Sequence, residues 1–153
     1  MSKTPRLAAA LAAAWEAEVV SARRLSAAAE RAPTPADKAR LLVLAAFCRA
    51  HASRLVARLS TMGRCPLPVP PEDVDVDDDP AIELKSQAHT ARHAAARYDT
   101  LAESSRAQAD VSSAWVCELN RAEEAELAEE LEIMALLHRR EGEFRHEHPP
   151  VPF

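Results

Sequence analysis

The chain has 153 residues, a formal net charge of −5 and only two glycines and one tyrosine. This length is enough for one domain with a buried core. The abundance of Ala, Leu, Glu and Arg and the few β-branched residues favour an all-α fold. The 19 basic residues are scattered among 24 acidic ones, which excludes the basic face that nucleic-acid binding requires.

The sequence also argues against a membrane or secreted protein. No stretch approaches the roughly 20 apolar residues of a membrane span. The short apolar run near the N-terminus continues as an amphipathic helix through Trp15 and Glu16, so we expect a helix of the mature fold rather than a signal peptide. Cys48, Cys65 and Cys117 are too widely spaced to indicate a disulfide framework or a CxxC zinc site. These features favour a cytoplasmic location.

Apolar residues recur at spacings of three and four along most of the chain, which predicts amphipathic helices. The helical blocks cover residues 5–31, 35–62, 80–108 and 111–140. Pro33 separates the first two blocks, Gly63 ends the second, and Asp110 is expected to cap the fourth. Residues 64–79 form a linker rich in Pro and Asp that is long enough to run the length of a helix. We therefore predict a ferritin-like four-helix bundle, made of two antiparallel hairpins joined by a long crossover.

The predicted domain ends near Gly142. Residues 1–141 are expected to form the bundle, and residues 142–153 an extended or disordered tail, because the glycine and three later prolines do not continue a helix. The tail ends in Pro-Pro-Val-Pro-Phe, an extended apolar segment suited to docking on a partner.

Polar residues interrupt the apolar stripes that should face the bundle core. On the first helix, Glu18 lies midway along such a stripe. The apolar members of this stripe are Leu7, Leu11, Ala14, Ala22, Leu25 and Ala29. On the second helix, Cys48 and His51 face inward one turn apart, and the stripe of the third helix passes through Ala91 and Tyr98.

The fourth helix carries carboxylates on its apolar stripe. The stripe consists of Leu119, Glu123, Glu126, Glu130, Ile133 and Leu137, whereas Glu124, Glu129 and Glu132 are expected to point elsewhere. Carboxylates withdrawn from water need a cation, a basic partner or a retained proton to compensate them. The stripe therefore predicts a binding site for a cation or a basic group.

These segments together resemble the ferritin-like di-iron superfamily, particularly its rubrerythrin-like members. In that family the first and third helices each supply a Glu, and the second and fourth each supply a Glu-x-x-His pair. The segment Cys48-Arg-Ala-His51 is similar to the second-helix pair, with Cys in place of Glu. The segment Glu123-Glu-Ala-Glu126 is similar to the fourth-helix motif, with Glu in place of His. The third-helix motif has Ala91 where the family has Glu.

The resemblance implies a metal protein whose ligands are Glu18, His51, Glu123 and Glu126. Iron is the implied metal, with manganese or zinc as alternatives, and two bound ions would imply Fe(II) oxidation by O₂ or peroxide. Because Ala91 supplies no ligand, the di-iron set is incomplete and a site for a single ion is the open alternative. The family also implies a homodimer or a higher homo-oligomer.

The same residues have a purely structural interpretation. Glu18 can pair with an arginine, Cys48 can act as a small buried hydrophobic residue, and His51 can be a neutral imidazole bonded to a carboxylate. The alternative function is therefore a non-catalytic helical bundle, a structural or interaction subunit that has lost the di-iron centre. His89 and His93 have the spacing of a metal pair but lie opposite the core stripe, so we expect both to be solvated.

Overall fold

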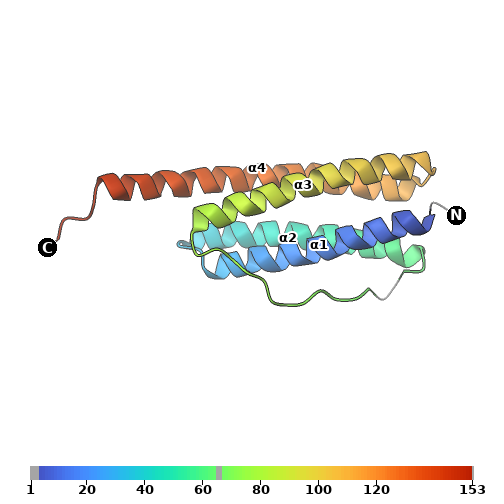
Figure 1. Ribbon diagram of the computed structural model, residues 1–153, viewed down its shortest axis with the longest axis horizontal. Helices are drawn as coiled ribbons and strands as arrows, with labels where there is room; N and C mark the ends of the chain where they lie inside the picture. Colours follow the sequence, from blue (N-terminus) through green and yellow to red (C-terminus); the bar gives the residue numbers. More distant parts are fainter. Residues whose placement is uncertain (1–3, 65–66, 153) are drawn as a thin grey trace.

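The structure is a computed structural model and describes residues 4–64 and 67–152. Its four helices are α1 (Thr4–Glu30), α2 (Pro35–Thr61), α3 (Pro80–Ala107) and α4 (Val111–Glu147), as Figure 1 shows. No strand occurs within these described ranges, so the expected all-α class is confirmed. None of the described helices is long and apolar enough to cross a membrane.

Three of the helices begin with a side-chain cap. Thr34, Asp79 and Asp110 each accept a hydrogen bond from a backbone N–H in the first turn, at α2, α3 and α4 respectively. Pro35 and Pro80 follow the first two caps at the first helical position, where the missing proline N–H costs nothing. The expected cap at Asp110 is therefore confirmed.

The helices form two antiparallel hairpins, α1 with α2 and α3 with α4 (Figure 1). Residues 67–79 then run along the first hairpin, from the end of α2 to the start of α3. Arg23 fastens this linker by donating to the carbonyl oxygens of Pro70 and Pro71 at 2.6 and 2.7 Å. Because the linker returns to the opposite end, α1 lies antiparallel beside α3, and α2 antiparallel beside α4.

The core has two hydrophobic parts. One contains Leu25, Leu41, Leu44, Leu84, Leu131 and Met134. The other, towards the opposite end of the bundle, contains Leu7, Leu11, Leu55, Leu59, Leu101 and Cys117. Between them lies a layer of buried polar side chains made of Glu18, His51, Tyr98, Asn120 and Glu124, which we call the polar layer. The whole apolar stripe predicted for the first helix is buried, and Glu18 lies within it as expected.

The predicted orientation of the fourth helix is wrong. Ile133 and Leu137 are each 47% exposed, and Glu126 is also exposed, so the predicted core stripe faces outward. The buried face of α4 consists instead of Ser113, Ala114, Cys117, Asn120, Glu124, Leu127, Ala128, Leu131 and Met134. The reason is that α4 carries two regular stripes, and packing against α2 and α3 selects the one that contains the smaller and more apolar side chains.

The fourth helix is also longer than predicted. It continues through Gly142 to Glu147, and extended chain begins at His148 rather than at residue 142. A single glycine inside a helix costs only about 1 kcal/mol, and the Arg and Glu residues around it are good helix formers. The ring of Phe144 stacks on that of His148 at a centroid distance of 4.6 Å, next to the prolines that end the helix.

Candidate metal centre

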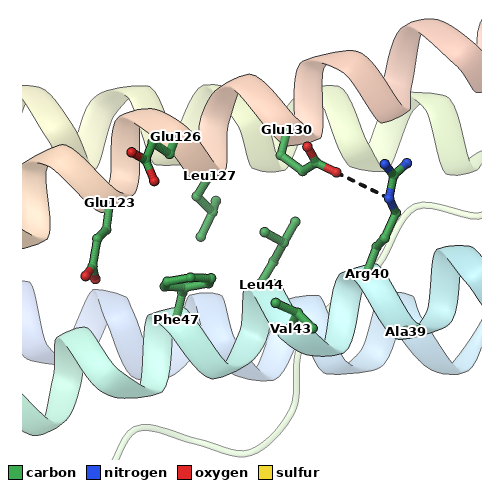
Figure 2. Close-up of a pocket in the computed structure, with 9 residues that line it drawn as sticks. All are labelled: Ala39, Arg40, Val43, Leu44, Phe47, Glu123, Glu126, Leu127 and Glu130. Atoms are coloured by element: carbon green, nitrogen blue, oxygen red, sulfur yellow. Dashed lines mark ion pairs between the residues drawn. The ribbon is translucent and has the colours of Figure 1, made fainter.

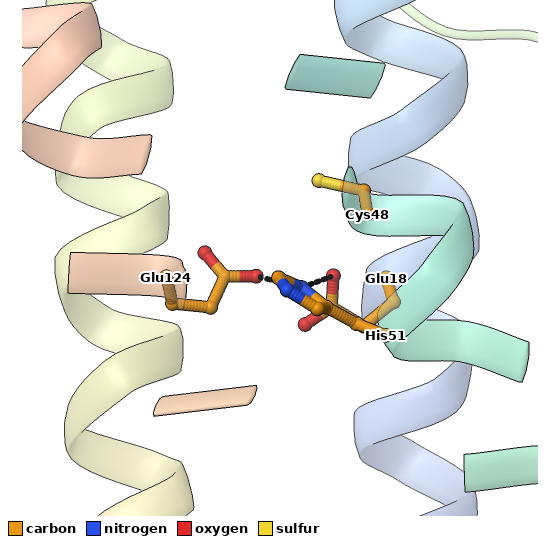
Figure 3. A group of neighbouring side chains, drawn as sticks. All are labelled: Glu18, Cys48, His51 and Glu124. Carbon is orange, nitrogen blue, oxygen red and sulfur yellow. Dashed lines mark hydrogen bonds and ion pairs between the residues drawn. The ribbon is translucent and has the colours of Figure 1, made fainter. Parts of the chain in front are cut away.

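Four potential metal ligands meet inside the bundle: Glu18 from α1, Cys48 and His51 from α2, and Glu124 from α4 (Figure 3). One ligand atom from each residue lies within 4.8 Å of the ligand atoms of all the others. All four residues are at most 2% exposed. Carboxylate, imidazole and thiol groups gathered at one buried point form a donor set that suits a transition metal.

Helical spacing and small neighbours position these side chains. Cys48 and His51 are three residues apart on α2, so they project from the same face one turn apart. Alanines occupy core positions one turn from the carboxylates, with Ala14 and Ala22 flanking Glu18 on α1. These small side chains leave space for the longer polar ones within the layer.

The imidazole of His51 is surrounded by carboxylates on both ring edges. Its Nδ1 lies 3.4 Å from Glu18 Oε2 and 3.2 Å from Glu124 Oε1. On the opposite edge, Nε2 lies 2.8 Å from Glu123 Oε2. Arg54 donates two hydrogen bonds to the Glu123 carboxylate, at 2.7 and 3.1 Å. His51 therefore presents one nitrogen to the cluster, while Glu123, itself held by Arg54, contacts the other.

Two further residues of the polar layer hold Glu18 and His51 in place. The Tyr98 hydroxyl donates a hydrogen bond of 2.7 Å to Glu18 Oε1, the carboxylate oxygen that faces away from His51. Asn120 donates to the backbone carbonyl of His51 at 3.4 Å and accepts from Arg54 at 3.1 Å. Tyr98 is completely buried, so its hydroxyl needs this partner.

The charges of the cluster follow from these contacts. Burial opposes ionisation of Glu18, but hydrogen bonds from its neighbours, chiefly His51, lower its pKa below the ordinary 4.5. Burial raises the pKa of Glu124 to about 7. For His51, burial alone would lower the pKa, yet the bonds to Glu124 and Glu18 raise it to about 9. At neutral pH without a metal, His51 is therefore a cation beside the anionic Glu18.

Cys48 completes the set as a neutral thiol. Burial raises its pKa, and the nearby Glu18 and Glu124 carboxylates raise it further. A thiol in these surroundings ionises only when a cation replaces its proton. The cluster thus holds exchangeable protons on Cys48, His51 and Glu124.

The structure unites two of the four predicted ligands. Glu18 and His51 lie in the cluster, whereas Glu123 contacts the opposite edge of the imidazole and Glu126 is exposed on the surface. The potential ligand that helical spacing did not predict is Glu124, which was expected to point away from the core. The spacing of Cys117, Asn120, Glu124, Leu127, Leu131 and Met134 is as regular as that of the predicted stripe, and this pattern was the available signal.

The third helix contributes no carboxylate to the cluster. Ala91 is buried at the position where the resemblance would require Glu. Gln87 donates to Glu83 Oε1 at 2.8 Å, and Arg24 binds both oxygens of Glu83 at 2.6 and 2.9 Å. Glu83 is therefore already neutralised by an arginine. His89 and His93 are exposed, as expected.

Comparison with known proteins gives the chain no family. No family model matches it, and neither the curated proteins nor the solved structures include a significant match.

Proposed function

We propose that this protein binds one divalent transition-metal ion in the polar layer, with Glu18, Cys48, His51 and Glu124 as ligands. The observation that carries the proposal is the position of His51 Nδ1 relative to the two buried carboxylates. Ligand atoms around a tetrahedral ion with bonds of about 2.1 Å lie roughly 3.4 Å apart. The distances of 3.4 Å to Glu18 and 3.2 Å to Glu124 match that spacing.

The surroundings of His51 support the same conclusion. A metal-binding histidine usually donates its second N–H to a carboxylate, which fixes the ring and makes the free nitrogen a better ligand. Glu123 lies 2.8 Å from Nε2 and is itself held by Arg54. Nδ1 is thus the nitrogen left for the ion.

The ligand set favours Zn(II), with Fe(II) as the next candidate. Imidazole and carboxylate ligands suit both ions, whereas a cysteine ligand favours zinc. With Cys48 bound as a thiolate, Glu18, Glu124 and Cys48 bring three negative charges to a divalent ion, so the buried site carries one net negative charge. Four protein ligands leave no open position, and this is typical of a site that stabilises the fold or holds the ion.

The fold is that of a ferritin-like bundle in this proposal, but the site is reduced to one ion. A second ion beside Cys48 and Glu124 would lie against Gln87, Ala91 and Leu127, none of which is acidic. Glu130, another conceivable ligand, pairs with Arg40 at 3.3 Å on the surface. A single-ion site does not support the two-ion oxidation of Fe(II) that the resemblance implies.

Metal titration of the wild type and of two matched variants tests the proposal. Protein purified without chelator is analysed for metals, and the apoprotein is titrated with Zn(II) and, under anaerobic conditions, with Fe(II). We expect one equivalent to bind the wild type and none to bind Glu124→Gln. Glu129→Gln makes the same change on the exposed side of α4 and should bind like the wild type. Absence of tight uptake by the wild type would refute the proposal.

A structural polar layer without metal is the second candidate, because one observation favours it. The buried side-chain N and O atoms of the cluster have hydrogen-bond partners in the absence of an ion, and the single orphan among such atoms in the described residues is Arg97 Nε. In this case the imidazolium of His51 serves as the cation of the layer. The two candidates differ in metal content, so the same titration separates them.

A further inference from the structure

The outward stripe of α4 is the surface feature that the metal site leaves unexplained. It consists of Glu126, Glu130, Ile133, Leu137, Arg140 and Phe144, and we call it the α4 outer stripe. These residues alternate at spacings of four and three, the period of the contact seam in a coiled coil. Ile133 and Leu137 are each 47% exposed, and Phe144 is 63% exposed. Exposed apolar residues at coiled-coil spacing indicate a contact surface for a second helix.

The outer stripe extends beyond the molecule's own bundle. The C-terminal part of α4 projects past the ends of the other helices, so none of the other described helices lies beside these turns (Figure 1). Short isolated helices are marginal in water, because most helical stability comes from packing of the apolar face. The projecting turns therefore fit a role in contact with another molecule.

A groove beside the stripe has the matching character. Figure 2 shows Val43 and Phe47 of α2 facing three glutamates of α4 across this groove. Val43 is 56% exposed and Phe47 is 40% exposed, so the floor of the groove is apolar. The glutamates are Glu123, Glu126 and Glu130. The groove thus combines exposed apolar side chains with an acidic edge.

Charge determines the direction in which a second helix can lie on the stripe. Glu126 and Glu130 precede its apolar centre, and Arg140 follows it. A parallel copy of α4 would place like charges opposite each other, whereas an antiparallel copy places Arg140 opposite the glutamates. With Ile133 opposite Leu137 of the second copy, Arg140 faces Glu130, the carboxylate that Arg40 of its own chain contacts at 3.3 Å. Phe144 then reaches the groove near Glu126. Neither Glu126 nor Arg140 has an ion-pair partner among the described residues.

We propose that two copies of this chain associate through the α4 outer stripe as a two-fold antiparallel pair, in which the projecting end of each α4 lies along the α2–α4 groove of the other. The contact is isologous, so each ion pair and each apolar contact occurs twice. The metal site lies on the opposite, inward face of α4, and this proposal does not depend on whether the site binds an ion.

The test measures the association state of the full chain by sedimentation velocity at several concentrations. The wild type should be a dimer, and Arg140→Glu should weaken its association by at least about tenfold, because two sets of like charges then meet. Arg139→Glu makes the same charge change on the neighbouring residue, which lies off the stripe and, among the described residues, pairs with Glu143. It should associate like the wild type, and circular dichroism should show that both variants are folded.

A mixing experiment identifies the contact. A chain with Glu126→Arg and Glu130→Arg should be mostly monomeric alone, as should Arg140→Glu. When the two are mixed, positions 130 and 140 carry opposite charges at both contacts, so a heterodimer should form. A wild type that stays monomeric at all concentrations would overturn the proposal. Equal association of Arg140→Glu, Arg139→Glu and the wild type would also overturn it.

Discussion

His51 Nε2 lies 2.8 Å from Glu123 Oε2, on the ring edge opposite the one that faces Glu18 and Glu124. Glu123 is therefore a support for the imidazole rather than a member of the ligand cluster. Loss of Glu123 should therefore affect metal binding differently from loss of its neighbour Glu124.

We expect Glu123→Gln to weaken metal binding without abolishing it. Loss of a carboxylate that orients a metal-binding histidine typically costs about 10–100-fold in affinity. The stoichiometry should stay at one ion, whereas Glu124→Gln should bind none. Competition titration with a chromophoric chelator measures both. Complete loss of binding in Glu123→Gln, with retention in Glu124→Gln, would instead identify Glu123 as the ligand.

Tyr98→Phe should destabilise the fold. The variant removes the hydroxyl that donates to the buried Glu18 carboxylate, and a hydrogen bond to a charged group contributes about 1.5–3 kcal/mol. Urea denaturation of the apoprotein should show this decrease in the free energy of unfolding. Thr100→Val removes an exposed hydroxyl on the same helix and should have little effect. Equal stability of the two variants would show that the Tyr98 bond contributes nothing.

Cys48→Ser should change the kind of metal site rather than the fold. In the wild type, bound Co(II) should give the near-ultraviolet charge-transfer absorption of a thiolate ligand. This absorption should disappear in Cys48→Ser, and the preference for Zn(II) over Fe(II) should fall. Cys117→Ser serves as the control, because Cys117 is buried in the hydrophobic part of the core, outside the cluster. Identical Co(II) spectra for wild type and Cys48→Ser would remove Cys48 from the ligand set.

The contribution of Glu83 to stability should depend on pH. Burial opposes its ionisation, but hydrogen bonds from Arg24, the Asp77 backbone and Gln87 lower the pKa of Glu83 below its ordinary 4.5. A carboxylate with a lowered folded-state pKa stabilises the fold above its unfolded pKa. That contribution is lost as the pH falls from about 4.5 through the lower folded value.

Glu83→Gln should therefore be less stable than the wild type at pH 7, by roughly 1–3 kcal/mol, because Arg24 loses its charged partner. The difference should shrink progressively below pH 4.5. Thermal unfolding monitored by circular dichroism from pH 7 to pH 3 measures it, with the exposed Glu16→Gln as control. A difference that stays constant over this range would contradict the assignment.

The sequence predicted the positions of Glu18 and His51 because α1 and α2 each offer one clear inward stripe. On α4 the same spacing rule selected the wrong stripe. It predicted Glu123 and Glu126 as the inward carboxylates, whereas the buried one is Glu124. Both stripes of this helix have regular spacing, and which one is buried depends on contacts with α2 and α3 that local periodicity does not contain. The larger apolar side chains, Ile133 and Leu137, are on the stripe that faces outward.

Supporting residues were harder to predict than ligands. Arg54 acts on the cluster through Glu123 and Asn120, and Arg24 of α1 binds the buried carboxylate of Glu83. Each of these pairs joins residues more than 50 positions apart in the chain. Such contacts follow from the way the two hairpins pack, which spacing within one helix does not determine.

The polar layer between the two hydrophobic parts of the core also controls how the hairpins align along their length. Alanine-rich helix faces are smooth and could pack almost equally well after a slide of one turn, about 5.4 Å. Such a slide would separate Tyr98 from Glu18 and His51 from Glu124, leaving buried charges without partners. Breaking a buried ion pair costs about 3–5 kcal/mol, so shifted alignments are strongly disfavoured. The polar layer therefore selects one axial alignment of the bundle, with or without a bound ion.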